Sequence, residues 1–140
     1  MSMPDRKLTA VAPADLPRIW PEIRCEVASV ESPDGFIPED AYAMCKAGEA
    51  VLFLLSVDDE RIGWMVLRLL GTDLHIWLLY ARPGHDPMTV FRGDLMTIAK
   101  GANPPARKLT FGSSRPAWGK VAPKHGFRVR NVVYECDVDL

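Results

Sequence analysis

The stretch Leu74-His-Ile-Trp-Leu-Leu-Tyr-Ala-Arg-Pro-Gly-His-Asp-Pro-Met88 contains the change of period that decides the fold. In residues 74–81 the alternating side chains leave both faces largely apolar, which predicts a central strand covered on both sides. Asp86 followed by Pro87 is an N-cap and first-turn signature, and apolar residues at helical spacing continue to Ala99. The stretch therefore predicts a strand that passes into a helix.

Two segments before this stretch predict an antiparallel meander. Ala50–Val57 is an apolar run, and a tight polar connection at residues 58–60 leads to a partner strand over Arg61–Leu70. A second tight turn at residues 71–73 leads into residues 74–81. Connections this short join antiparallel neighbours, so we expect three strands side by side.

The segments after the helix predict a crossover and a closing strand. Arg107–Phe111 should form a strand parallel to residues 74–81, because a helix connects the two. A short helix is expected over Ala117–Lys124, then a turn, then a last strand over Arg130–Val138 with alternating apolar residues.

The first third of the chain predicts one strand and two helices. Leu8–Val11 is a short strand, and Asp15 can cap a helix to about Val30, which Pro21 would kink or delay. Pro38 opens a second helix that ends near Lys46. The order β-α-α-β-β-β-α-β-α-β predicts an α/β (α+β) fold in which about four helices flank a mixed sheet of about six strands.

Composition and charge fit one globular domain over residues 1–140. Apolar residues make up 48% of the chain and charged residues 25%. Seventeen basic and eighteen acidic residues give a net charge of -1, which argues against a nucleic-acid partner, although basic residues crowd the last third.

The cysteines indicate a reducing compartment, and the apolar runs indicate that no segment spans a membrane. Cys25, Cys45 and Cys136 fit neither a disulfide framework nor a metal-ligand spacing. No apolar run follows the charged N-terminus, and none elsewhere is long enough to span a bilayer. We therefore expect a cytoplasmic protein with no membrane partner and no metal.

The closing piece of the chain carries a resemblance to a known family. It consists of the strand Lys108–Phe111, a helix around Trp118, and the sequence Lys-His-Gly-Phe at residues 124–127. Gly126 can leave the helix in a left-handed conformation, and Phe127 can then dock on the core. This piece and the element order over nearly the whole chain resemble the GNAT superfamily of coenzyme-A-dependent N-acyltransferases.

The resemblance implies acetyl-CoA as cofactor, held where two parallel strands splay apart. Its pantetheine amides would pair with the backbone of residues 75–81, and its pyrophosphate would sit on the loop of residues 82–88. The cofactor-binding positions implied on this chain are Leu79, Tyr80, Ala81, Arg82, Gly84, His85 and Met88. A helix N-terminus binds phosphate through its unpaired N–H groups and its positive dipole end.

The loop departs from the family pattern of Gln or Arg, two residues, Gly, one residue, and Gly or Ala. Only Arg82 and Gly84 match that pattern. Pro83 and Pro87 lack an N–H, and Asp86 places a negative charge where phosphate would bind.

Acyl transfer requires a neutral amine, a polarised thioester carbonyl and a proton for the departing thiolate. The resemblance implies that a backbone N–H near Leu79 or Tyr80 polarises the carbonyl. No tyrosine lies between Ala81 and Val133, where the family often supplies its acid. The candidate catalytic residues are therefore His75, Tyr80, Ser114 and Glu26, with His85 and Glu31 as further bases. A structural hydrogen bond for His75 and plain packing for Tyr80 are the competing interpretations.

Two functions follow. The first is direct transfer of an acetyl group to the amine of a small molecule or a protein. The second is a degenerate GNAT-fold binding or assembly module, of the compact kind common in bacteria and their viruses, with a homodimer through an apolar sheet edge or helix face as one arrangement.

Overall fold

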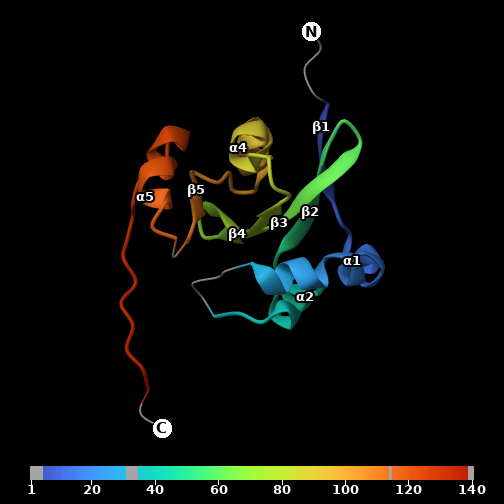
Figure 1. The fold of residues 1–140 in the computed structure, drawn as a ribbon, viewed down its shortest axis with the longest axis horizontal. Coiled ribbons are helices and arrows are strands. Elements are labelled where there is room, and N and C mark those ends of the chain that lie inside the picture. The colour runs from blue at the N-terminus through green and yellow to red at the C-terminus, as the bar shows by residue number, and fades with distance from the viewer. Residues whose placement is uncertain (1–4, 31–34, 114, 139–140) are drawn as a thin grey trace.

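A computed structural model describes residues 5–30, 35–113 and 115–138. Its strands form one sheet in the order β1-β2-β3-β4-β5, antiparallel throughout except for the parallel pair β4 and β5 (Figure 1). The bounds of the strands are β1 Arg6–Ala10, β2 Val51–Val57, β3 Glu60–Leu70, β4 Asp73–Ala81 and β5 Lys108–Phe111. The predicted meander and the parallel crossover are thereby confirmed.

Helices cover both faces of this sheet. α1 and α2 pack on one face and α4 lies over the other, while α5 stands beside β5 (Figure 1). The bounds of the helices are η1 Pro13–Asp15, α1 Leu16–Ser29, α2 Pro38–Lys46, α3 Pro87–Val90, α4 Arg92–Gly101, α5 Trp118–Val121 and η2 Ala122–His125. Among the described residues, no helix is long and apolar enough to cross a membrane.

Each face of the sheet has its own hydrophobic core. On the α1 and α2 face, Ile23 and Val27 pack against Trp64, which has no exposed surface. On the opposite face, Phe91 and Leu95 pack against Met65 and Ile76. Burial of these apolar side chains is the main source of stability for a domain of this kind.

The predicted helices form with three differences, one of which is that the helix expected over Ala117–Lys124 is the short α-helix α5 followed by the 3₁₀ turn η2. α1 runs unbroken to Ser29 with Pro21 inside it, so the proline neither delays nor ends the helix. The helix expected over residues 87–101 is divided into α3 and α4, because Phe91 leaves helical geometry at ψ 9° while its side chain is fully buried.

The turn at Gly126 has the predicted conformation. Gly126 ends η2 at φ 84°, in the left-handed region that glycine adopts at low cost. Phe127 then packs against Phe111, with 4.9 Å between the ring centroids.

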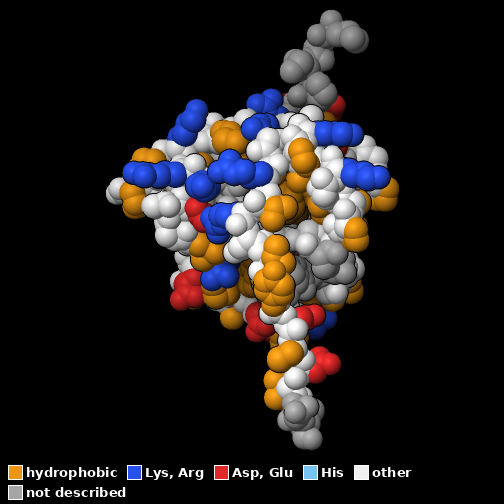
Figure 2. Space-filling model, turned by 90° about the vertical axis from the view of Figure 1, so that its left-hand side faces the viewer, with side chains coloured by type: hydrophobic (Ala, Val, Ile, Leu, Met, Phe, Trp, Pro, Cys, Tyr) orange, Lys and Arg blue, Asp and Glu red, His pale blue; other side chains and the backbone are white. Residues whose placement is uncertain are grey.

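The predicted last strand over Arg130–Val138 is wrong. The described residues of this segment, up to Val138, form no strand, and they lead away from the sheet with their side chains exposed (Figures 1 and 2). β5, the strand beside this segment, has only four residues and offers too short an edge for a nine-residue partner. The sheet therefore has five strands in place of about six.

A β-bulge at Trp77 reverses the faces of β4. Val66 of β3 pairs with Leu78, and Leu67 pairs with Ile76, so Trp77 has no partner on β3. Ile76 and Leu79 consequently face the α4 side, and Trp77 and Leu78 face the α1 side. Bulges of this kind re-aim side chains and are common beside active sites.

Gly63 allows β3 to approach the end of β4. A Cβ atom at this position would lie 2.0 Å from the Tyr80 carbonyl oxygen and 2.9 Å from the Ala81 Cα. Both are backbone atoms of the strand that pairs with β3. Any larger residue at position 63 would collide with β4, so the glycine is required for residues 80–81 to pair closely with β3.

We expect Gly63→Ala to lower the free energy of unfolding by roughly 1–3 kcal/mol, because the methyl group must push the two strands apart. Gly101→Ala is the matched control, since nothing lies within 4 Å of its added Cβ. Urea denaturation of both variants measures the difference. Equal stabilities for the two variants would contradict the contact.

Candidate functional site

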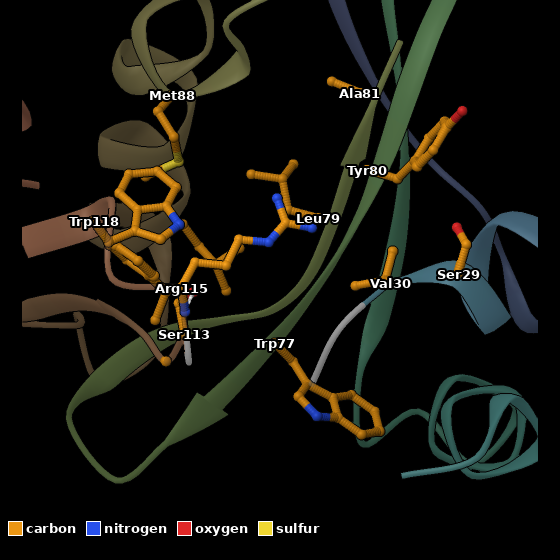
Figure 3. Close-up of a pocket in the computed structure, with 13 residues that line it drawn as sticks. Ser29, Val30, Trp77, Leu79, Tyr80, Ala81, Met88, Ser113, Arg115 and Trp118 are labelled. Carbon is orange, nitrogen blue, oxygen red and sulfur yellow. Dashed lines mark hydrogen bonds between the residues drawn. The ribbon is translucent and has the colours of Figure 1, made fainter. Parts of the chain in front are cut away.

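A cavity of about 310 Å³ lies where β4 continues past the end of β5 (Figure 3). The pairing of the two strands runs from Asp73 and Lys108 to Ile76 and Phe111, and β4 then extends alone to Ala81. The residues that line the cavity are Ser29, Val30, Ile76, Trp77, Leu79, Tyr80, Ala81, Met88, Phe111, Gly112, Ser113, Arg115 and Trp118. The volume lies at the lower end of the range of small-molecule sites.

The backbone of Leu79 and Ala81 points to the open edge of β4. Arg82 donates its N–H to the Ile62 carbonyl on β3 at 2.8 Å. Successive backbone N–H groups of a strand point to opposite edges, so the N–H of Tyr80 also points to β3. The N–H groups of Leu79 and Ala81 point to the other edge, where β5 no longer pairs with β4. The cavity therefore has a strand edge with hydrogen-bonding groups along one wall.

The side chains of the lining lie on both sides of β4. Leu79 points toward Met88, Trp118 and the guanidinium of Arg115, whereas Tyr80 points to the opposite side, toward α1 (Figure 3). The Tyr80 ring stacks on Trp64 at 5.9 Å. One part of the cavity is thus formed by α3 and the segment after β5, and the other by the C-terminal end of α1.

Trp77 lines both this cavity and a second, more open one of about 640 Å³. Its ring packs at 5.6 Å from Phe36, and the Arg68 guanidinium lies 5.1 Å from the Trp77 ring centroid. Both aromatic rings line the second cavity. Trp77 thus contributes an aromatic side chain to the lining of both cavities.

Polar side chains of the loop between β4 and α3 already have partners within the protein. Arg82 pairs with Glu60 at 3.4 Å, and Gly84 turns the chain at φ 88°. Asp86 caps α3 by accepting hydrogen bonds from the Thr89 hydroxyl at 2.8 Å and the Thr89 N–H at 3.3 Å. The bond from the Thr89 side chain holds the pKa of Asp86 below its ordinary value, so the carboxylate is an anion at neutral pH.

The predicted cofactor positions divide into two groups. Leu79, Tyr80, Ala81 and Met88 line the cavity. Arg82, Gly84 and His85 lie in the loop and are not among its lining residues. The roles of all seven stay predictions.

Of the candidate catalytic residues that the structure describes, Tyr80 alone lines the cavity. The His75 ring lies 2.8 Å from the Thr110 hydroxyl, in the paired part of β4 and β5. Glu26 accepts a hydrogen bond of 3.0 Å from the indole of Trp64. Tyr80 lines the cavity, and Ser114 and Glu31 lie outside the described residues.

In the segment that follows β5, sequence analysis named Ser114 as a candidate but did not name Arg115 or Trp118 as site residues. Ser113, Arg115 and Trp118 line the cavity from this segment, and Phe111 packs edge-on against Trp118 at 4.8 Å. Ligands of open α/β sheets bind beyond the carboxyl ends of the strands, so the position of these residues after β5 was an available signal. Within residues 5–30, 35–113 and 115–138, no group of three metal-ligating side chains occurs.

Glu26 can be tested for a structural role against a catalytic one. We expect Glu26→Ala to lower the unfolding free energy by about 1–3 kcal/mol, because it leaves the buried Trp64 N–H without its acceptor. Glu26→Gln retains an acceptor oxygen and should keep both stability and any acyl-transfer rate. A large loss of rate in Glu26→Gln at unchanged stability would instead show that the carboxylate takes part in the reaction.

The cysteines should differ sharply in reactivity. Burial raises the pKa of the Cys45 thiol to about 11, so very little thiolate is present at pH 8, whereas Cys25 and Cys136 are exposed. Titration of the folded protein with a thiol reagent should modify Cys25 and Cys136 rapidly and Cys45 only after unfolding. Rapid modification of Cys45 in the folded protein, located by peptide mass mapping, would contradict this burial.

The comparisons with known proteins concern the fold. No family model matches the sequence, and no curated protein matches it in sequence. An acetyltransferase from Trypanosoma brucei is 17% identical with a TM-score of 0.61, over 96% of this chain and 100% of that one. An aminoglycoside N-acetyltransferase in complex with CoA is 14% identical with a TM-score of 0.62, over 97% of both chains.

A third solved structure, a predicted acetyltransferase with acetyl-CoA from Clostridium acetobutylicum, is 14% identical with a TM-score of 0.62. The match covers 95% of this chain and 96% of that one. Likeness at these identities concerns architecture, and the architecture agrees over nearly the full length of each chain. The chain has the fold of the GNAT acetyltransferases, as its sequence predicts.

Proposed function

We propose that this protein transfers an acetyl group from acetyl-CoA to an amine by direct attack, without a covalent enzyme intermediate. The observation that carries the proposal is the open edge of β4 beyond Ile76, where Leu79 and Ala81 present backbone groups to a cavity. When bound, acetyl-CoA would supply the acyl group as an activated thioester. The cavity and the strand edge fit an extended ligand that carries amides of its own.

The Leu79 and Ala81 N–H groups supply the donors that this chemistry needs. Neither is used by β5, because the β4–β5 pairing ends at Ile76. Both belong to the same strand, which is held on its other edge by β3, so their directions are fixed before a ligand arrives. Fixed donors stabilise the charge that develops on a carbonyl oxygen without reorganisation.

Arg115 gives the α3 side of the cavity a positive charge. Its guanidinium extends toward Leu79 (Figure 3). Asp86 already accepts a hydrogen bond from the N–H of Thr89 at the start of α3. This helix end therefore has fewer free N–H donors for a phosphate than the family pattern would give. We propose that Arg115 contributes to holding the negatively charged cofactor in its place.

The α1 side of the cavity is suited to the acceptor amine. Val30, Trp77 and Tyr80 form an apolar and aromatic wall, next to Ser29, whose hydroxyl donates a hydrogen bond of 2.7 Å to the Glu26 carbonyl. Such a wall orients an apolar or aromatic group and also interacts favourably with a cationic amine above a ring face. The acceptor proposed is therefore an amine, on a small molecule or a protein, that carries an apolar or aromatic group.

Isothermal titration with acetyl-CoA tests the proposal. We expect saturable binding by the wild-type protein and binding weakened roughly tenfold or more in Ser113→Trp, whose indole would fill the cavity. Thr72→Trp is the matched control, because Thr72 is exposed in the turn between β3 and β4. Release of free CoA thiol in the presence of amines then measures transfer.

No binding by the wild-type protein would contradict the proposal and favour a binding or assembly module. Equal affinities of Ser113→Trp and Thr72→Trp would place the cofactor elsewhere on the molecule. Loss of binding in both variants would point to a general effect on the fold, which thermal unfolding detects independently.

A further inference from the structure

The Arg68 side chain, on β3, forms no ion pair with an acidic residue in the described part of the chain. Side chains alternate along a strand, so Arg68 lies on the same side of the sheet as Trp64 and Val66, under α1 and α2. Its Nε atom is buried there and has no hydrogen-bond partner among the described residues. A buried donor without a partner costs free energy, so this group calls for an acceptor from a ligand.

The bulge at Trp77 fixes the position of the Arg68 guanidinium. Trp77 has no partner on β3, and its side chain packs on the α1 and α2 side of the sheet. The guanidinium carbon lies 5.1 Å from the centroid of the Trp77 ring, and Phe36 packs against the same ring at 5.6 Å. A cation–π contact occupies no N–H group with a hydrogen bond, so it orients the donors of Arg68 and leaves them available.

Arg68 lines the second cavity, whose volume of about 640 Å³ is that of a small-molecule site. Phe36 and Trp77 form the aromatic part of its lining. On α2 and directly after it, Ala43 and Ala47 line the cavity with methyl groups alone, which leaves room beside the guanidinium. The cavity therefore combines an aromatic surface with a cation whose donors have no partner among the described residues.

The charged side chains of this cavity favour one kind of anion. Asp40 and Glu49 line it together with Arg68, so acidic side chains outnumber basic ones. Two carboxylates repel a multiply charged phosphate, whereas a molecule with one carboxylate and one ammonium group meets the opposite sign for each. The Nε–H and an Nη–H of arginine also match the two oxygens of a single carboxylate. The cavity thus fits the carboxylate of a zwitterion.

Trp77 lines this second cavity and also the cavity beside Leu79. Its ring points away from Leu79 (Figure 3). Two strand residues, roughly 7 Å of chain, separate Trp77 from Leu79. A ligand that reaches from Arg68 to the Leu79 N–H therefore needs an amine several bonds away from its carboxylate, with a methylene chain that can lie against the Trp77 ring.

We propose that Arg68 binds the carboxylate of the acceptor, and that the acceptor is an amino acid with a second, distal amine. The substrate role rests on the proposed acyl transfer, while binding of the carboxylate needs no cofactor. The neutral distal amine attacks the thioester carbonyl, and the new C–N bond forms as the C–S bond breaks. The nitrogen loses one proton and the CoA thiolate gains one, so the products are an amide and CoA thiol. Arg68 positions the acceptor.

Titration calorimetry with L-lysine, in the absence of acetyl-CoA, tests the carboxylate site. We expect saturable binding of L-lysine by the wild-type protein and binding roughly tenfold or more weaker for cadaverine, which is L-lysine without its carboxylate. Arg68→Met should lower the affinity for L-lysine to that for cadaverine. Arg61→Met is the matched control and should bind L-lysine as the wild-type protein does, because Arg61 lies on the same strand and lines neither of the two cavities.

A second variant, Arg68→Lys, keeps the positive charge but lacks the paired N–H groups, and it should also bind L-lysine more weakly than the wild-type protein. Thermal unfolding checks that each variant is folded. No binding of L-lysine by the wild-type protein, equal affinities for L-lysine and cadaverine, or an unchanged affinity for L-lysine in either Arg68 variant would each overturn the proposal.

Release of CoA thiol separates this inference from the proposed acyl transfer. With acetyl-CoA present, kcat/KM should be higher for L-lysine than for cadaverine in the wild-type protein and equal for the two amines in Arg68→Met. Binding of L-lysine without any release of thiol would contradict the acyl transfer and leave the carboxylate site standing. Equal values of kcat/KM for the two amines in the wild-type protein would overturn the assignment of the acceptor.

Discussion

The early end of the β4–β5 pairing is the constraint on which the rest of the site depends. β5 stops at Phe111, opposite Ile76, while β4 continues for five residues under the hold of β3. A backbone edge without a partner is costly inside a protein unless water or a ligand satisfies it. The cavity at this edge is thus a consequence of strand length, and Gly63 keeps the protruding end of β4 in place by allowing β3 to approach it closely.

The bulge at Trp77 adds the second element of the site. Without it, the side chains of residues 78–81 would exchange faces, and Leu79 would leave the α3 side. With it, one short strand presents Leu79 to the proposed cofactor side and Tyr80 to the proposed acceptor side. The loop that follows offers fewer free donors for a phosphate than the family pattern, because the Asp86 carboxylate accepts hydrogen bonds from the N–H and hydroxyl of Thr89 at the start of α3.

Local patterns predicted much of this fold because their physical causes are local. The short turns of the meander, the helix start at Asp86 and Pro87, and the left-handed Gly126 follow from turn and cap chemistry. The bulge at Trp77 was beyond such reasoning, since it arises from pairing with β3. The strand expected at Arg130–Val138 failed because alternation gives a strand its face but cannot supply its neighbour. Arg115 and Trp118 were missed because only the folded chain brings them to β4.

Amide hydrogen exchange of β4 tests the central claim most directly. Leu79 and Ala81 should exchange faster than Leu78 and Tyr80 in the free protein, because their N–H groups face the open edge. Saturating acetyl-CoA should slow Leu79 and Ala81 selectively and leave the amides already bonded to β3 unchanged. Exchange at Leu79 and Ala81 that is unaffected by acetyl-CoA would contradict the account.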